Sequence, residues 1–421
     1  MTPPAPPLPA ASRTAAGTPM PSQDAWFHRQ QSSGTACMTV AVLGWFDGPP
    51  PTLAALRELA GVRLRPYRRL CLRAARTSLA DWPLWLPEPE FDPSFHIRAE
   101  PPATSPEELA ADPLDPDRPP WRLHLLPGPT GDGFALLLRA HHALLDGCSL
   151  TTVLRAVLDG PTVRLPEPPA RPRTPAGRGR ELAWSVADLL PRARPLPFHG
   201  PVGPRRALAF SRIPRAELDA ARAALSPLRA SGNAVFLAAT AGALRSLGLT
   251  GRLPLLPGVC ALVPVDVRTA DQASLLGNHY ATVRVPLPAR RHPERRLAVA
   301  HSRSRREVLK QKAGAQAELV NGRPLRRTSL DDLLGRYVDS PRYFSVLCSS
   351  IATHGGHLTL GPATFTALSL IPPLGPGHPL AVTMVHHDTT TVVTAIADLR
   401  HRQLAEPLAD LIHEEIRVLA R

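Results

Sequence analysis

Short apolar runs alternate with amphipathic segments along most of the chain, and the clearest example lies in its first half. Residues 134–140 form an apolar run of strand length. Residues 149–158 follow with the spacing of an amphipathic helix. The apolar positions of this helix share one face: Leu150, Val153, Leu154 and Val157. The pattern therefore predicts a strand, a turn and a helix in succession.

The second half of the chain carries a similar mixture of patterns. Helical spacing predicts helices over 181–190, 215–229, 232–247, 293–314 and 402–419. The apolar helix over 232–247 is expected to be capped at Ser231 or Asn233. Runs rich in Val, Thr and aromatic residues predict strands over 258–264, 280–286, 342–351, 379–386 and 389–397. These elements together indicate an α/β fold.

Length and composition divide the chain into two folded parts, since 421 residues suit two domains of about 200 each. Residues 1–20 are rich in Pro, Ala and Thr and predict a disordered tail, which makes Met20 a candidate for the true start. An N-terminal domain is expected over 21–160 and a C-terminal domain over 205–421. A Pro- and Arg-rich linker with a crossover helix joins them over 161–204.

The formal charge of +14 first suggests a nucleic-acid or lipid partner. Arginine supplies it almost alone, because the chain has lysine only at Lys310 and Lys312. The arginines are scattered and aromatic residues make up only 5%, so no platform for stacking bases is expected. An anionic lipid surface or the phosphates of coenzyme A fit this charge better than nucleic acid does.

Cysteine usage and apolar stretches indicate the compartment. The five cysteines are dispersed and form no Cys-x-x-Cys pair, so neither a disulfide framework nor a zinc site is expected. The start lacks the apolar core of a signal peptide, and polar residues interrupt the most apolar stretch, 234–249. The sequence therefore predicts a cytoplasmic protein, with peripheral contact to the inner membrane face as an open alternative.

The sharpest chemical motif combines two adjacent histidines with an acid and a glycine: His141, His142, Asp146 and Gly147. A histidine titrates near neutral pH, so on a turn after a strand it can take a proton from a hydroxyl or thiol. The carboxylate can fix the turn, and the glycine permits a tight path. Two surface histidines before a helix would give the same local pattern, so the motif alone leaves both interpretations open.

The motif and five further segments resemble the bacterial wax ester synthase/diacylglycerol acyltransferase family, whose members carry His-His-x-x-x-Asp-Gly. The further segments are Ser22–Phe27, Phe91 and Asp92 with His96, Pro113–Asp115 with Pro119–Trp121, Gly200–Arg206, and Leu276–Asn278 with Val285–Pro288. Pro120 stands where leucine is usual. The matches keep their order over roughly residues 21 to 421.

The resemblance implies two chloramphenicol acetyltransferase-like domains that form a pseudo-dimer with a tunnel between them. His142 would then act as general base on an alcohol that attacks acyl-CoA, without a covalent intermediate, a metal or a further cofactor. His141, Asp146 and Gly147 would support the loop. Asn278 is the candidate donor to the oxyanion, with a simple turn residue as the equal alternative.

The chain departs from the family at three places. Asn233 and Ala234 stand where the family has Asn-Asp, and residues 349–354 replace its Ser-Asn-Val-Pro-Gly-Pro segment. The doublet of His386 and His387 before Asp388 is unusual and is interpreted as an exposed strand end.

Three functions follow from these patterns. One is a wax ester or triacylglycerol synthase that uses long-chain acyl-CoA and a lipid alcohol. The second is an acyltransferase for a specialised metabolite or a carrier-bound acyl group, which the altered segment 349–354 favours. The third is a non-catalytic lipid-binding protein of the same fold, which the intact His142 disfavours.

Overall fold

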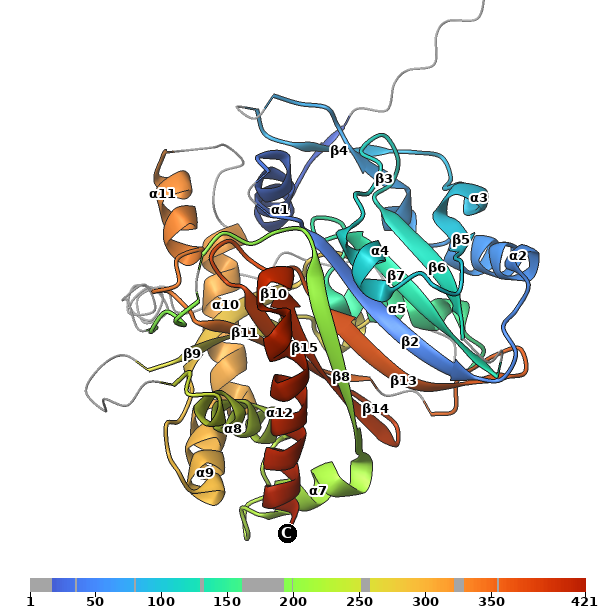
Figure 1. Ribbon diagram of the computed structural model, residues 1–421. Coiled ribbons are helices and arrows are strands. Elements are labelled where there is room, and N and C mark those ends of the chain that lie inside the picture. Colours follow the sequence, from blue (N-terminus) through green and yellow to red (C-terminus); the bar gives the residue numbers. More distant parts are fainter. Residues whose placement is uncertain are drawn as a thin grey trace, which may run out of the picture.

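The computed structural model describes residues 17–34, 36–78, 81–128, 132–160, 193–198, 200–250, 258–321, 329–353 and 356–421. Within these ranges the chain forms two six-stranded sheets and a small three-stranded sheet. Figure 1 shows two lobes, with the blue and cyan strands in one and most of the yellow-to-red helices in the other.

Each large sheet combines strands that are distant in the sequence. The first has the order β12-β13-β2-β7-β6-β5 and the second β10-β9-β11-β14-β15-β8, while β1, β4 and β3 form the small sheet. The strands are β1 Thr18–Pro19, β2 Thr39–Asp47, β3 Leu72–Ala74, β4 Leu84–Pro87, β5 Ile97–Ala99, β6 Trp121–Pro127, β7 Gly133–His141, β8 Arg206–Pro214, β9 Cys260–Asp266, β10 Tyr280–Pro286, β11 Val346–Thr353, β12 Thr359–Leu360, β13 Ala363–Ile371, β14 Leu380–His387 and β15 Thr390–Asp398.

Helices cover both sheets. They are α1 Ser22–Ser32, α2 Leu53–Leu64, α3 Pro93–His96, α4 Pro106–Ala111, α5 Gly147–Val157, α7 Arg215–Ala223, α8 Gly232–Ser246, α9 Pro293–Arg303, α10 Arg306–Asn321, α11 Ser329–Val338 and α12 Ala405–Ala420, with 3-10 turns η1 Arg68–Cys71, η2 Ala270–Gln272 and η3 Leu399–Leu404. In the second lobe α8 is buried from Ala234 to Leu244. The long apolar stretch is therefore the centre of a core, and none of the described helices is long and apolar enough to cross a membrane.

Strand β13 departs from the division expected at residue 205. It pairs antiparallel with β2, from Thr364 opposite Asp47 to Ile371 opposite Ala41, and so completes the sheet of the first lobe. Figure 1 shows this orange strand beside the blue β2. The C-terminal segment therefore contributes to both lobes, because an apolar run predicts a strand without selecting its partner.

The last residues of the segment expected to be disordered, 17–20, are ordered. Residues Thr18 and Pro19 pair with β4, and Met20 is fully buried. The carbonyl of Met20 accepts a hydrogen bond of 2.8 Å from the Trp82 indole. The expectation of disorder is therefore wrong for residues 17–20, while residues 1–16 lie outside the described ranges.

Several predicted elements differ in length from the observed ones. The helix expected over 215–229 ends at Ala223, since Pro227 disfavours helical geometry in the residue before it. The helix expected over 293–314 is two helices, because Ser304 leaves helical geometry with φ −117° and its hydroxyl bonds the Ala300 carbonyl. Most of the expected linker, including the helix over 181–190, lies outside the described residues.

Candidate functional site

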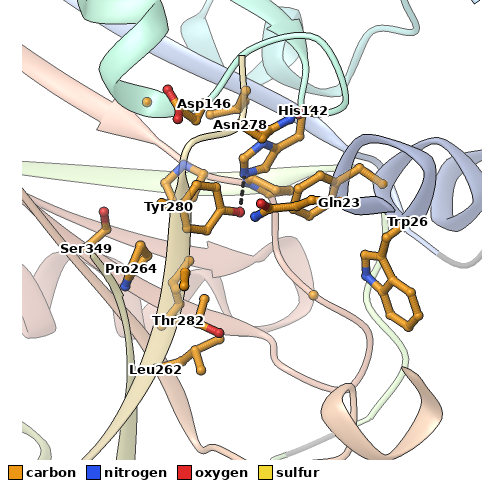
Figure 2. A pocket seen from close by; sticks show the side chains of 18 of the residues that line it. Gln23, Trp26, His142, Asp146, Leu262, Pro264, Asn278, Tyr280, Thr282 and Ser349 are labelled. Atoms are coloured by element: carbon orange, nitrogen blue, oxygen red, sulfur yellow. Dashed lines mark hydrogen bonds between the residues drawn. The ribbon is translucent and has the colours of Figure 1, made fainter. Parts of the chain in front are cut away.

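A cavity of about 880 Å³ lies where the two lobes meet. Helix α1, the turn after β7, strands β9 to β11 and helices α10 and α11 line it. Figure 2 shows His142 and Tyr280 facing one another inside it. Of the predicted site residues, His142, Asp146, Gly147 and Asn278 line the cavity and His141 does not.

His142 is held on three sides. Its backbone N–H donates to the Met38 carbonyl at 2.7 Å, and its ring stacks on Phe27 with centroids 4.1 Å apart. Its Nε2 lies 3.4 Å from the Tyr280 hydroxyl. Its Nδ1 is buried and has no hydrogen-bond partner among the described residues. The ring thus presents Nε2 to the cavity.

The environment keeps the His142 imidazole neutral. Burial lowers its pKa, and its own backbone carbonyl, the Asp146 carboxylate and the Asn278 amide oppose this shift without cancelling it. At pH 7 the ring is therefore unprotonated at one nitrogen. Of the two ring nitrogens, Nε2 faces the cavity and the Tyr280 hydroxyl, so it is the one placed to accept a proton from a substrate.

His141 has a different role. It is 6% exposed, and its Nδ1 accepts the Ala143 backbone N–H at 3.0 Å. Burial lowers its pKa to about 3, so it stays neutral. It therefore shapes the turn rather than facing the cavity.

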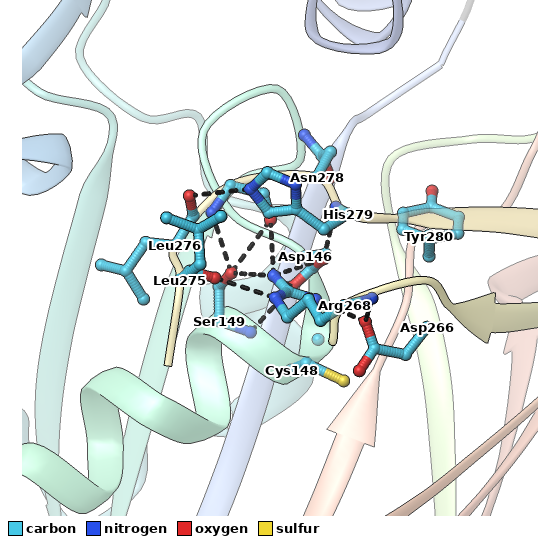
Figure 3. A network of polar contacts seen from close by, with 12 residues as sticks. Asp146, Cys148, Ser149, Asp266, Arg268, Leu275, Leu276, Asn278, His279 and Tyr280 are labelled. Carbon is cyan, nitrogen blue, oxygen red and sulfur yellow. Dashed lines mark hydrogen bonds and ion pairs between the residues drawn. The ribbon is translucent and has the colours of Figure 1, made fainter. Parts of the chain in front are cut away.

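Asp146 joins the two lobes (Figure 3). Its Oδ1 accepts the Ser149 N–H at 2.7 Å and so caps α5. Its Oδ2 forms an ion pair of 2.9 Å with Arg268 and accepts the His279 N–H at 3.0 Å. Arg268 also donates to the Gly277 carbonyl at 3.2 Å. The carboxylate is therefore committed to fixing the turn against the second lobe.

Gly147 lies where neighbouring side chains leave little room for a Cβ. Its φ is not positive, so the backbone there does not need the left-handed conformation that favours glycine. A Cβ there would lie 3.0 Å from a methyl carbon of Ile351 and 3.1 Å from one of Leu370. The glycine lets the start of α5 pack closely on β11 and β13.

Asn278 already uses its amide hydrogens. Its Nδ2 donates to Asp24 Oδ1 at 2.9 Å and to the His142 carbonyl at 2.7 Å, with the Ala143 carbonyl at 3.2 Å. An amide carries only two hydrogens, so none is left for an oxyanion. The contacts instead tie the histidine turn to α1.

Sequence reasoning missed three residues of this site. Arg268 is 5% exposed and anchors Asp146, yet no local pattern marks it. The sequence pattern marks Tyr280 only as the start of a strand. Asp24 lies in a segment that carries the family resemblance, but its bonds to Asn278 and to Arg69, at 2.5 Å, appear only in three dimensions.

The far side of the cavity is partly polar. Asp339, at the end of α11, lines it and accepts a hydrogen bond of 2.7 Å from Gln30. Burial raises the pKa of Asp339 to about 6. His378 fixes the Asp339 backbone carbonyl through Nε2 at 3.1 Å.

The altered segment 349–354 forms part of the cavity wall. Residues 349–352 of β11 line it, and His354 lies outside the described residues. The histidine doublet at the end of β14 is not simply exposed: His387 is 4% exposed, and its Nδ1 lies 2.9 Å from the Thr353 hydroxyl. His386 contacts the Thr391 hydroxyl at 2.8 Å across the hairpin. Within the described ranges, no three His, Cys, Asp or Glu side chains are arranged as metal ligands.

One family model matches the chain. The wax ester synthase/diacylglycerol acyltransferase catalytic domain matches residues 20–315. A Mycobacterium tuberculosis protein described by name as a diacylglycerol O-acyltransferase is 32% identical over 272 residues, which are 56% of this chain and 60% of that protein. A similarly described Mycobacterium bovis protein is 29% identical over 51% of this chain and 50% of its own length. The matched region thus spans 50 to 60% of the length of these relatives.

Solved structures share the fold. The wax ester synthase/diacylglycerol acyltransferase from Marinobacter aquaeolei VT8 has a TM-score of 0.64 and 18% identity, over 96% of this chain and 100% of that one. A mutant starter condensation domain of rhizomide synthetase, solved with C8-CoA and Leu-SNAC, also has a TM-score of 0.64, with 16% identity over 96% and 94% of the two chains. The predicted two-lobed α/β fold is therefore confirmed.

Proposed function

Because the chain belongs to the wax ester synthase/diacylglycerol acyltransferase family, we propose that it transfers a fatty acyl group from acyl-CoA to the hydroxyl of a long-chain alcohol or a diacylglycerol. The observation that carries the proposal is a neutral histidine, His142, whose Nε2 faces a cavity lined by both lobes. Such a cavity can admit the thioester and the alcohol together.

The reaction needs one proton carrier. His142 Nε2 takes the proton of the acceptor hydroxyl while that oxygen bonds to the thioester carbonyl carbon. The carbonyl electron pair moves to its oxygen and then returns, which breaks the carbon–sulfur bond. The imidazolium gives its proton to the thiolate of coenzyme A. The products are an ester and free coenzyme A, and the histidine is neutral again.

The neighbours of His142 position it for this task. Phe27 holds the ring plane, and Met38 fixes the backbone. Asp146 and Asn278 tie the turn to Arg268 and to α1 rather than touching the reacting atoms. Bringing the reactants together in this fixed geometry accounts for part of the rate.

The proposal is tested by following coenzyme A release from palmitoyl-CoA with a thiol reagent. Reactions with 1-hexadecanol, with a diacylglycerol and without acceptor are compared, and the lipid products are separated by chromatography. Release stimulated by a lipid alcohol, together with the matching ester, is expected. A folded sample that neither alcohol stimulates would contradict the lipid acceptor.

A lipid acceptor has to be taken from a lipid surface, so the proposal includes peripheral contact of a cytoplasmic protein with the inner membrane face. The formal charge of +14 supports attraction to anionic lipids. Sedimentation with vesicles is expected to retain more protein when they contain phosphatidylglycerol than when they contain phosphatidylcholine alone. Equal retention would contradict an electrostatic contact.

A second candidate function is transfer to an acceptor that carries a polar or cationic group, and Asp339 favours it. Its carboxylate is mostly ionised at pH 7, lines the cavity and forms no ion pair among the described residues. Gln30, which donates to this carboxylate, lies three residues after Phe27 on α1, roughly 4.5 Å of helix rise beyond the residue that stacks on His142.

This candidate is tested with a long-chain amino alcohol and the plain alcohol of the same length. The wild type should prefer the amino alcohol, and Asp339→Asn should remove that preference while retaining activity on the plain alcohol. Asp410→Asn, an exposed change on α12, is the matched control and should alter neither. Equal preference in the wild type and Asp339→Asn would exclude a role for this carboxylate.

A further inference from the structure

The proposed transfer creates a negative charge that the residues described so far do not bind. When the acceptor oxygen adds to the thioester, the carbonyl oxygen becomes an oxyanion, and a preorganised donor lowers the barrier strongly. Asn278 is committed to Asp24 and the His142 carbonyl, and Asp146 is an acceptor. The donor has to come from another wall of the cavity.

Tyr280 lies on that wall. It is the first residue of β10 and lines the cavity opposite the histidine turn. Its hydroxyl is 3.4 Å from His142 Nε2, and the two rings have centroids 5.9 Å apart and an angle of 27°. Figure 2 shows the hydroxyl directed at the imidazole, beside the Gln23 side chain.

The state of this hydroxyl suits a donor. Burial raises the pKa of Tyr280, with Asp146 adding to the shift, so the phenol keeps its proton at any working pH. The Gln23 side chain lies beside the phenol oxygen and partly opposes this shift in the pKa of Tyr280. The only hydrogen bond that the described residues give this hydroxyl is the long one to His142 Nε2, so the single hydrogen of the phenol is available on the side of His142.

The spacing leaves room for the reacting atoms. A separation of 3.4 Å is longer than a normal hydrogen bond to a hydroxyl, so Nε2 holds the phenol hydrogen only weakly. The attacking oxygen has to lie within about 3 Å of Nε2 to give up its proton. The oxyanion sits on the same carbon as that oxygen, and the Tyr280 hydroxyl, 3.4 Å from Nε2, is close enough to reach it.

We propose that the Tyr280 hydroxyl is the oxyanion donor of this enzyme, oriented by Gln23, an inference that rests on the proposed acyl transfer. During addition the phenol O–H turns from Nε2 to the oxyanion while Nε2 receives the acceptor proton. The phenol keeps its proton throughout, so Tyr280 takes no part in the proton balance. Gln23 acts through Tyr280 and is a positioning residue.

The test is Tyr280→Phe, which removes only the hydroxyl. Loss of one oxyanion donor is expected to lower kcat roughly 100- to 1000-fold, with a much smaller change in KM for palmitoyl-CoA. Gln23→Met should lower kcat less. Tyr67→Phe is the matched control, because Tyr67 is 6% exposed in the core of the first lobe and does not line the cavity, and it should leave kcat unchanged.

The pH profile separates a direct role from one exerted through His142. If Tyr280 binds the oxyanion, the acid limb of kcat/KM keeps its midpoint in Tyr280→Phe while the plateau falls. A shifted midpoint with little change in the plateau would overturn the proposal in favour of tuning the histidine. A Tyr280→Phe variant with the wild-type kcat would also overturn the oxyanion role of Tyr280. If His142→Ala is inactive in the same assay of palmitoyl-CoA, the proposed acyl transfer would still stand.

Discussion

The Asp146 carboxylate contacts both lobes, and its side chain is only 4% exposed. It caps α5 through Ser149, binds Arg268 and receives the His279 N–H. Arg268 is as deeply buried, with 2% of its side chain exposed. Without Asp146, Arg268 would keep only its ion pair of 3.0 Å with the half-exposed Asp266, and losing the buried partner costs far more than losing a surface pair.

We therefore predict that Asp146→Ala lowers the free energy of unfolding by about 3 kcal/mol, because Arg268 loses its buried partner. Urea denaturation of the wild type and the variant measures this. Asp117→Asn is the control, since Asp117 pairs with Arg76 on the surface and should leave the unfolding midpoint unchanged. Equal midpoints for Asp146→Ala and the wild type would contradict the structural role.

The spacing of the histidine motif predicted which residues gather at the site, but not how each is used. His142 and Asp146 are adjacent in space because a strand-turn-helix unit brings them together. Arg268 and Tyr280 arrive from the other lobe, more than a hundred residues later in the chain. Local spacing carries no information about such partners. The family resemblance suggested Asn278 as the oxyanion donor, with a turn residue as the equal alternative, but its amide hydrogens already bind Asp24 and the His142 carbonyl.

At the scale of elements, α1 and α11 close the cavity by direct contact. A Cβ on Gly335 of α11 would lie 1.9 Å from the ring of Trp26 on α1. Gly314 on the neighbouring α10 has open space around it. Both glycines lie in helices, so an added Cβ changes helix propensity similarly at both. The two positions differ mainly in whether that Cβ would clash with a neighbouring side chain.

This contrast gives a matched pair of variants. Gly314→Ala should raise the melting temperature slightly, since alanine favours a helix over glycine by up to about 1 kcal/mol, and should leave acyl transfer unchanged. Gly335→Ala should displace Trp26 and lower kcat/KM for the acceptor at least about tenfold. Steady-state kinetics and thermal unfolding measure both effects. Identical kinetics for the two variants would show that the α1–α11 contact does not shape the site.

The sequence predicted the presence of elements better than their partners. Strand β10 was expected with its observed bounds, and helix α8 nearly so, because regular spacing and a Ser231 cap are local properties. The pairing of β13 with β2 in the first sheet was not predicted, because a buried strand has the same apolar sequence pattern in either sheet. The break between α9 and α10 lies at Ser304, whose backbone leaves helical geometry with φ −117°, and the helical spacing on either side did not predict it.

Across the whole molecule, histidines are buried in the neutral state in both lobes. Burial lowers the pKa of His96 to about 4, and that of His141 and His378 to about 3, from an ordinary value of 6.5. Between those values the unfolded chain binds more protons than the folded one, so acid favours unfolding. Burial also raises the pKa values of the Asp339 and Glu415 carboxyls, which act in the opposite sense but are fewer than these histidines.

We therefore predict that stability is full above about pH 6.5 and falls steadily as the pH drops toward 4. Melting temperatures measured in half-unit steps from about pH 8 to about pH 4.5 check this. His378→Gln should make the fall shallower, because glutamine can still donate to the Asp339 carbonyl but does not titrate. A melting temperature that stays constant down to about pH 5 would contradict the buried neutral state of these histidines.

The most direct test of the central claim compares the wild type with His142→Ala in acceptor-stimulated release of coenzyme A from palmitoyl-CoA. Loss of the general base should lower the rate roughly 100- to 10,000-fold, while the melting temperature stays near that of the wild type. His292→Ala, a change at an exposed histidine, should keep full activity. A folded His142→Ala protein that still transfers the acyl group at the wild-type rate would contradict the account.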